Sequence, residues 1–261
     1  PSFPGRDLSS LKYIVAGGMS VPASLIRQCE AAFGVDIING YGQTETSGVS
    51  CSTVASDTAA IKSSTSGKPL PGVSFNIVDG QGDTLPCDQP GELCYRGPGQ
   101  MLGYLNHQGP QDKLADAGWL RSGDLATMDA DGYIRIVGRA SEMIIRGGEN
   151  LSPSEIEAFL LQHEDVAEAA VIGLPDVKYG EEVCAVIIPS HPGHADSEAL
   201  RSWCAQGLSR WKVPKYISFV DAYPKTPSGK IQKFLLRDTM ISTLGLQNHD
   251  ELRAGEHDST A

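Results

Sequence analysis

The beginning of the chain contains the feature that most restricts its fold: a strand-like run, a glycine turn and a helix-like stretch in succession. Leu11 to Ala16 form an apolar run that ends at Gly17-Gly18. Val21 to Phe33 then has apolar residues at helical spacing, and Val35 to Ile38 make a second strand-like run. This order predicts an α/β unit. The polar segment from Asn39 to Thr46 is then expected where such folds bind ligands, in a loop at the end of a parallel strand.

Between Gly67 and Gly138 the pattern changes to short β-like runs separated by glycine turns. The runs are residues 73–78, 92–96 and 133–137. Residues 129–132 (DADG) predict a hairpin turn between two of these strands, because Asp and Gly favour tight-turn conformations. A small barrel or sandwich appended to the α/β part is therefore expected.

A second domain is predicted beyond Arg139. Its first helix has a well-specified start, with Ser152 as N-cap, Pro153 at the first helical position and Glu155 in a capping box. The further elements are strands at 143–145, 169–174, 183–189 and 216–220, a helix at 197–208, and a turn at 147–148. They predict a compact α+β domain of ordinary size. The polar tail 242–261 has no periodicity and is expected to be disordered.

Charge and composition exclude several classes of function. Lys and Arg number 21 and Asp and Glu 32, so the net charge is 21 − 32 = −11, which disfavours nucleic acid and anionic lipid as partners. No apolar run approaches the roughly 18 residues that a membrane span needs. The six cysteines contain no C-x-x-C pair, which favours a reduced compartment, and a cytoplasmic location is expected.

Five short motifs follow one another along nearly the whole chain. They are residues 41–45 (YGQTE), 91–93 (GEL) with 103–104 (GY), 118–124 (GWLRSGD), 138–150 (GRASEMIIRGGEN) and 224–231 (PKTPSGKI). In this order and spacing they resemble the C-terminal motif series of the adenylate-forming (AMP-binding) superfamily, in its acyl-CoA synthetase branch of medium-chain or fatty-acid type.

The resemblance gives each part of the chain a place in that family's architecture. Residues 1–138 would be the C-terminal part of the large α/β N-terminal domain, with an α/β unit at 1–63 and a β-barrel-like part at 64–138. Residues 139–241 would be the smaller, mobile α+β C-terminal domain that also binds AMP.

The resemblance also implies a nucleotide-binding set. It comprises Gly18, Met19, Gly40, Tyr41, Gly42, Thr44, Asp124, Arg139 and Lys230. Tyr41 would lie against the adenine ring. Thr44 would meet the α-phosphate and Glu45 would hold Mg²⁺, because metal and phosphate oxygen share a coordination shell. The competing interpretation of this segment is a polar β-turn with a packed tyrosine.

One acidic and one basic side chain would bind the ribose. Asp124 would accept from both ribose hydroxyls, and Arg139 would reach the same sugar. Asp124 could instead cap a turn before a strand, and both interpretations can hold together. Ser122 stands where the family usually has Thr. Ser141 occupies the hinge position, where the family commonly has Asp or Lys, and this departure leaves the hinge detail open.

Lys230 is the principal catalytic candidate. By the resemblance its ammonium bridges the substrate carboxylate and the phosphate, where a point charge stabilises an anionic transition state. The ordinary alternative is a solvated surface lysine. Gly147 and Gly148 would line the path of the CoA pantetheine, since glycine lets backbone pass close to a ligand. Their alternative is an ordinary turn between a strand and a helix.

The implied activity is that of an ATP-dependent acid–CoA ligase. A carboxylic acid and ATP would give acyl-AMP and pyrophosphate, and CoA would then give acyl-CoA and AMP. The ligands would be a small medium-chain or fatty acid, ATP, Mg²⁺ and coenzyme A, and a homodimer stays open. The alternatives are an aryl-acid CoA ligase, an adenylation domain that feeds a carrier protein, and a non-catalytic nucleotide-binding fragment. The family's phosphate loop and most of its acyl pocket would lie upstream of Pro1, so the chain is expected to be inactive alone.

Overall fold

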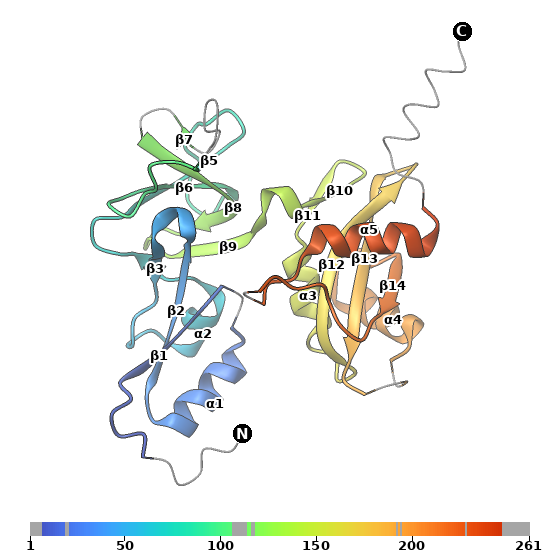
Figure 1. The fold of residues 1–261 in the computed structure, drawn as a ribbon, viewed down its shortest axis with the longest axis horizontal. Coiled ribbons are helices and arrows are strands. Elements are labelled where there is room, and N and C mark those ends of the chain that lie inside the picture. Colours follow the sequence, from blue (N-terminus) through green and yellow to red (C-terminus); the bar gives the residue numbers. More distant parts are fainter. Residues whose placement is uncertain are drawn as a thin grey trace. The chain divides into compact units, whose positions relative to one another are not determined.

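The computed structural model describes residues 7–18, 21–105, 114–115, 118–191, 193, 195–227 and 229–246. The chain divides into two compact units, Pro1–Ala140 and Ser141–Ala261 (Figure 1). The described residues form three sheets with helices packed on them, which confirms the predicted α/β class. The division lies two residues beyond the predicted boundary after residue 138, because strand β9 (Ile134–Arg139) still carries Arg139 in unit 1.

Unit 1 begins with a four-stranded sheet in the order β1-β2-β3-β4. Its strands are β1 (Tyr13–Gly17), β2 (Asp36–Gln43), β3 (Gly48–Ser52) and β4 (Lys68–Pro69), and its helices are α1 (Ala23–Phe33) and α2 (Ala59–Ser64). β1 and β2 are parallel, with Gly17 opposite Gly40. Ile26 of α1 and Ile37 of β2 are buried together, so the predicted strand, glycine turn, helix and strand form one packed α/β unit.

The short helix α2 is missing from the sequence analysis. At six residues it is too short to be stable by propensity alone. Tertiary contacts hold it instead: the Lys62 ammonium, whose side chain is 2% exposed, lies 2.8 Å from Glu30 and 3.5 Å from Asp36. The Asn39 amide donates to the Lys62 carbonyl at 3.0 Å. A buried lysine is therefore the anchor of α2.

The second sheet of unit 1 is antiparallel. Its strands are β5 (Ser74–Val78), β6 (Gly91–Arg96), β7 (Leu114–Ala115), β8 (Trp119–Met128) and β9. Asp129 caps the predicted hairpin turn between β8 and β9, since its carboxylate accepts from the backbone N–H groups of Asp131 and Tyr133. Leu93, Ala126 and Ile134 form the buried face together with Cys51 of β3.

Unit 2 is built around a five-stranded sheet whose long central hairpin is covered on both faces. The strands are β10 (Ile144–Arg146), β11 (Glu149–Leu151), β12 (Val166–Asp176), β13 (Gly180–Pro189) and β14 (Tyr216–Phe219). The helices are α3 (Pro153–Leu160), α4 (Ser197–Gly207) and α5 (Lys233–Leu244) (Figure 1). Alternate residues of β12 and β13 enter two separate cores, one beneath α3 and α4 and the other beneath α5. The strands therefore read as nearly continuous apolar runs.

Helix α5 corrects the predicted disordered tail. The tail was placed from residue 242 onward, but α5 continues to Leu244 and ends at Gly245, whose φ is 63°. Leu236, Met240 and Ile241 bury one side of the helix against the sheet, which outweighs its weak local signal. Residues 247–261 lie outside the described residues.

The start of α3 is a second correction. Ser152 is the N-cap residue, but its side chain makes no capping hydrogen bond and instead lies 2.8 Å from the Ser154 hydroxyl. Glu155 does not complete a capping box either, because its carboxylate pairs with Lys212 at 2.6 Å. A long-range ion pair has therefore replaced the predicted local hydrogen bonds of the capping box.

No helix within the described residues has the length and apolar character needed to cross a membrane.

Candidate functional site

Two glycines meet where the parallel strands end. Gly17 closes β1 opposite Gly40, and a Cβ on Gly17 would lie 2.5 Å from the Gly40 carbonyl oxygen. Gly18 follows with φ of 79°, a conformation that disfavours any other residue. Main chain is therefore exposed at the edge where the resemblance places the adenine. Met19, the other predicted residue here, lies outside the described residues.

The predicted loop from Asn39 to Thr46 is largely strand. β2 continues to Gln43 because β3 pairs with it antiparallel, with Tyr41 opposite Cys51 and Gln43 opposite Gly48. A Cβ on Gly42 would clash with the Gly48 carbonyl, so this close pairing requires glycine. The loop prediction is wrong for most of the segment, and the site is built on a strand and the short 3-10 helix η1 (Thr44–Thr46).

Tyr41, Asp124 and Arg139 form one group that is joined by a hydrogen bond and an ion pair. The Tyr41 hydroxyl donates to Asp124 Oδ2 at 2.5 Å, and Arg139 Nε lies 2.9 Å from Asp124 Oδ1. Asp124 and Arg139 are register partners in β8 and β9, which explains their proximity. Asp124 is buried, whereas about half of the Arg139 side chain is exposed. The structure thus brings together three residues that the sequence analysis singled out from three separate motifs.

Burial and charge keep Tyr41 protonated. Burial raises the pKa of the Tyr41 hydroxyl far above its usual value, and the neighbouring charge and hydrogen bond of Asp124 raise it further. The backbone of Asp124 is also held by the Ser122 hydroxyl, which accepts from the Asp124 backbone N–H at 3.0 Å. Ser122 thus fills a structural role beside the candidate ribose carboxylate.

Thr44 and Glu45 lie next to each other on η1. Thr44 is exposed, and the Glu45 carboxylate accepts from the Tyr104 hydroxyl at 2.6 Å. The turn is fixed by Thr46, which is buried and accepts from the Ser50 hydroxyl at 2.7 Å. Tyr104 belongs to the predicted GY motif, but the sequence assigns it no contact. It is a neighbour of Glu45 that sequence reasoning missed.

Lys230 sits on a short hairpin immediately before α5. Lys225 and Ile231 form an antiparallel bridge, and the Thr226 backbone N–H donates to the Lys230 carbonyl at 2.8 Å. Gly229 has φ of 86°, which lets the chain reverse there. The Lys230 side chain is exposed, and it makes no ion pair with the described residues of the protein. Its backbone is fixed while its ammonium remains accessible.

Gly147 and Gly148 also occupy a hairpin turn, which corrects the predicted turn between a strand and a helix. They join β10 to β11 with φ of 60° and 88°, values that favour glycine in two-residue hairpins. The Gly147 N–H donates to the Tyr179 carbonyl at 2.7 Å. Arg146 beside them is ion-paired with buried Glu182 at 2.8 Å. The turn is thus exposed on a firmly held base, with Gly147 lying against the Trp211 and Tyr179 rings and open space around Gly148.

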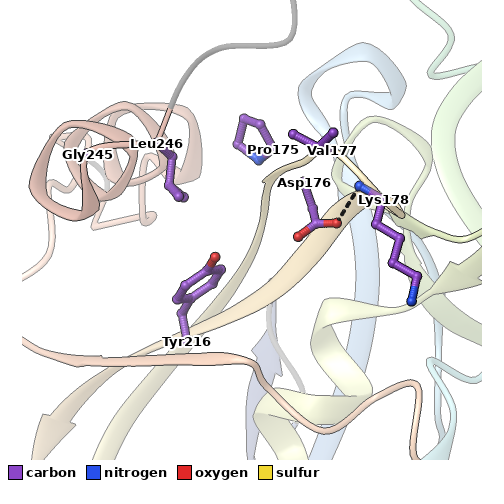
Figure 2. Close-up of a pocket in the computed structure, with 7 residues that line it drawn as sticks. All are labelled: Pro175, Asp176, Val177, Lys178, Tyr216, Gly245 and Leu246. Carbon is purple, nitrogen blue, oxygen red and sulfur yellow. Dashed lines mark hydrogen bonds between the residues drawn. The ribbon is translucent and has the colours of Figure 1, made fainter.

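A pocket of about 410 Å³ lies elsewhere in unit 2, near the C-terminal end of α5. Figure 2 shows Asp176, Tyr216 and Leu246 among its lining residues. The Asp176 carboxylate accepts from the Lys178 N–H at 2.9 Å and from the Lys215 ammonium at 2.7 Å. None of the predicted site residues lines this pocket.

Two family models match the chain. The model described as AMP-binding enzyme matches residues 2–105, and the one described as AMP-binding enzyme C-terminal domain matches residues 155–230. The chain belongs to the adenylate-forming superfamily. The two matches fall in the two structural units, in the order expected of an adenylate-forming enzyme.

Individual adenylate-forming relatives agree with this assignment. A mitochondrial medium-chain acyl-CoA ligase, ACSF2 of Bos taurus, is 39% identical over 94% of this chain and 40% of its own. The o-succinylbenzoate CoA synthetase MenE of Bacillus subtilis, solved with its acyl-adenylate, has a TM-score of 0.80 and 31% identity over 89% of this chain and 47% of its own. The amide bond synthetase McbA of Marinactinospora thermotolerans has a TM-score of 0.82 and 33% identity, over 92% and 49%. The chain spans less than half the length of each of these relatives.

Proposed function

We propose that this chain is the C-terminal part of an AMP-forming acid–CoA ligase. The observation that carries the proposal is the Tyr41–Asp124–Arg139 group, centred on buried Asp124, in a chain that also presents Lys230 and the Gly147-Gly148 turn on exposed hairpins. A carboxylic acid and ATP would form acyl-AMP and pyrophosphate, and the CoA thiol would then form acyl-CoA and release AMP. Splitting one difficult step through a mixed anhydride gives two easier ones.

The nucleotide would bind on unit 1. Tyr41 would pack against adenine, with the backbone at Gly18 and Gly40 alongside its edge. Asp124 would hold the ribose hydroxyls. Its Oδ2 already accepts a hydrogen bond from Tyr41 and its Oδ1 is ion-paired with Arg139, and a carboxylate oxygen can accept a further hydrogen bond. These contacts would orient the carboxylate before the ribose arrives, which lowers the cost of ordering it on binding.

Glu45 is the residue that fits a magnesium ion. The described residues contain no cluster of three or more acidic, histidine or cysteine side chains, so an all-protein metal cage is not supported there. Mg²⁺ is usually held by one or two carboxylates together with substrate phosphates. Glu45 on η1, beside exposed Thr44, suits that arrangement. The ion would neutralise phosphate charge, while Thr44 would donate to the α-phosphate.

Lys230 and the two glycines would serve different half-reactions. The Lys230 ammonium would lie between the acid carboxylate and the α-phosphate during adenylation, where opposing negative charges must approach. The Gly147-Gly148 turn would admit the pantetheine arm during thioester formation, since neither residue carries a side chain and the space around Gly148 is open. Ser141, at the division between the units, would act as the hinge for this exchange.

A medium-chain or fatty acid is the substrate class we favour, on the strength of the similarity to the ACSF2 ligase. An aryl acid is the second candidate, supported by the structural similarity to o-succinylbenzoate CoA synthetase. A carrier-protein thiol remains a rival acceptor to CoA. Retention of Glu45, Asp124 and Lys230 together argues against a non-catalytic nucleotide-binding protein. A cytoplasmic location remains part of the proposal.

The test is a panel of straight-chain and aryl acids supplied to the complete enzyme with ATP, Mg²⁺ and either CoA or a carrier protein. AMP release that depends on the acid, with a matching thioester of CoA, is the expected result. Pyrophosphate release without a CoA thioester would move the assignment to a carrier-protein adenylation domain. Nucleotide binding without pyrophosphate release for any acid would leave only the non-catalytic reading.

A further inference from the structure

A partly buried group of charges ties the first residues of unit 2 to α5. The Lys233 ammonium lies 2.8 Å from Glu157 of α3 and 3.1 Å from Glu142, which directly follows the division between the units. The Lys233 side chain is only 19% exposed, and the Glu157 side chain 18%. Glu157 also accepts from the Val171 backbone N–H at 2.7 Å. One lysine therefore holds three segments that are distant in sequence.

The neighbouring carboxylates together have a larger effect on the pKa of Lys233 than its burial has. Burial alone would lower the pKa of Lys233, but the charges of Glu157 and Glu142 outweigh burial and raise it. The ammonium is therefore charged throughout the neutral range. Removing it would leave two carboxylates close together with no cation between them, which is unfavourable because Glu157 is largely shielded from water while Glu142 is partly exposed.

Arg237 repeats the contact one turn further along α5. Its Nε donates to the Gly173 carbonyl at 2.8 Å, and its guanidinium lies 3.5 Å from Glu181. Glu181 in turn accepts from the Ile145 backbone N–H at 2.8 Å. Residues four apart share one face of a helix. The two basic residues thus hold both ends of the segment from Glu142 to Ile145, one directly and one through Glu181.

The same helix begins immediately after the Lys230 hairpin. Ile231 packs into the core beneath α5, and the Gln232 N–H donates to the Pro224 carbonyl at 2.8 Å. Only two residues separate Lys230 from Lys233. The Gly147-Gly148 turn has a separate support, because Arg146 pairs with Glu182 and Gly147 bonds to Tyr179.

We propose that Lys233 is a positioning residue for adenylation: by joining Glu142 to the start of α5, it fixes Lys230 relative to the hinge. This inference rests on the proposed function, in which unit 2 turns about Ser141. A rotation of unit 2 about the hinge moves Lys230 with it only if the segment after the hinge and the hairpin before α5 move as one rigid body. The Lys233 bridge supplies that connection. The glycine turn is connected to the hinge through the chain itself, residues 142–146, and has the Arg146–Glu182 pair as a further support, so it depends on the bridge less.

The decisive variants are Lys233→Gln and Lys233→Arg in the complete enzyme. Lys233→Gln is expected to lower kcat for acid-dependent pyrophosphate release by about tenfold, as for loss of an indirect positioning contact, and to change KM for ATP by less than about twofold. Conversion of supplied acyl-AMP to acyl-CoA should fall by less than about twofold. Lys233→Arg keeps the charge and should restore most of the adenylation rate.

Lys225→Gln is the matched control. Lys225 lies on the Lys230 hairpin and pairs with Glu168 at 3.1 Å, but both side chains are substantially exposed. Exposed pairs contribute little, so both half-reactions should stay near the wild-type rate. Amide hydrogen exchange gives a readout without substrate: exchange over residues 142–145 should accelerate in Lys233→Gln and stay unchanged in Lys225→Gln.

The possible results distinguish a failure of the Lys233 proposal from a failure of the proposed ligase function. Equal losses in both half-reactions that follow the loss of thermal stability would make Lys233 a merely structural residue and overturn the proposal. An unchanged adenylation rate in Lys233→Gln would overturn it as well. A wild-type enzyme that releases no pyrophosphate with any acid would instead refute the proposed ligase function. In that case the exchange measurement still reports whether Lys233 holds the segment after the hinge.

Discussion

The candidate residues of the two units differ in how they are held. In unit 1, Tyr41, Asp124 and Arg139 satisfy one another, and Asp124 is buried. In unit 2, the Lys230 side chain and the Gly147-Gly148 turn project from hairpins whose bases are fixed but whose tips are exposed. In unit 1 the candidate binding residues therefore also contribute to the stability of the fold. In unit 2 the candidate residues contribute little to stability, as expected of groups that approach a ligand from a movable body.

This contrast predicts different consequences of mutation in the two units. Substitutions in unit 1 should lower stability and nucleotide affinity together. Replacing the exposed Lys230 side chain in unit 2 should alter one half-reaction and leave stability nearly unchanged, whereas a side chain at Gly148 should alter the other half-reaction and add local backbone strain. The predictions below test this difference, beginning with the largest expected effect.

Lys230→Gln should lower the rate of acyl-AMP formation by about 10²–10³, because the substitution removes a positive charge from a transition state with opposing anions. Conversion of supplied acyl-AMP to acyl-CoA should remain close to normal, and the melting temperature should not change, since the side chain is exposed. Pyrophosphate release and thioester formation are measured separately, with Lys225→Gln as the control. Equal losses in both half-reactions would show that Lys230 is structural and that the tips are not specialised.

Gly148→Leu should reduce thioester formation by about 10², in line with the cost of misplacing a reacting group by about 1 Å, and should spare adenylation. The space around Gly148 is open, but its φ of 88° makes any side chain strained. Gly245→Leu provides a matched strain at φ of 63°, at the end of α5. If both variants lose thioester formation equally, the effect comes from strain in unit 2 and not from a blocked path.

Asp124→Asn should weaken AMP binding to the complete enzyme by about tenfold, the effect of losing a hydrogen bond to a charged group. It should also lower the melting temperature of this chain, because Arg139 loses its anionic partner and Tyr41 its strongest acceptor. Calorimetric titration with AMP and thermal unfolding measure the two effects. Asp131→Asn, on the exposed β8–β9 turn, is the control. Weaker AMP binding with an unchanged melting temperature would contradict the idea that the same residues of unit 1 bind the nucleotide and stabilise the fold.

The sequence predicted what local pattern and motif order can encode. The glycines at residues 17–18 predict the strand ends, and the apolar runs of β12 and β13 predict the core of unit 2, since both cores bury alternate residues of these strands. Tyr41, Asp124 and Arg139 come from different motifs, and the fold does bring them together.

The sequence could not predict features that depend on distant partners. Lys62 is buried because Glu30 and Asp36 face it, and no local pattern distinguishes it from an exposed lysine. Lys233 likewise depends on Glu142 and Glu157. The predicted capping box failed for the same reason, because a tertiary partner competed for Glu155. Tertiary ion pairs therefore account for much of what pattern analysis missed.

Tyr41→Phe tests the comparison at its finest level, with Tyr223→Phe of unit 2 as its counterpart. Both hydroxyls donate one hydrogen bond, Tyr41 to the Asp124 carboxylate and Tyr223 to the Val186 carbonyl at 2.8 Å. A bond to a charged group contributes about 2 kcal/mol and a neutral one about 1 kcal/mol. At pH 7 Tyr41→Phe should therefore destabilise its unit more than Tyr223→Phe does.

The pH dependence gives this last prediction its sign. Burial and, second, a neighbouring carboxylate raise the pKa of both tyrosines in the folded protein, Asp124 acting on Tyr41 and Glu168 on Tyr223. An unfolded tyrosine ionises near pH ~10, so the stabilisation is complete below that pH and is lost above it by about 1.4 kcal/mol per pH unit. Replacing either tyrosine by phenylalanine removes this loss, so the stability deficit of each variant relative to the wild type should shrink as the pH rises from 10 to 11.

Urea unfolding at pH 7, 9, 10 and 11, followed in each unit by hydrogen exchange, measures both effects. A larger deficit for Tyr223→Phe at pH 7 would reverse the ranking of the two units, and an unchanged alkaline slope in Tyr41→Phe would mean that its hydroxyl ionises normally in the folded protein.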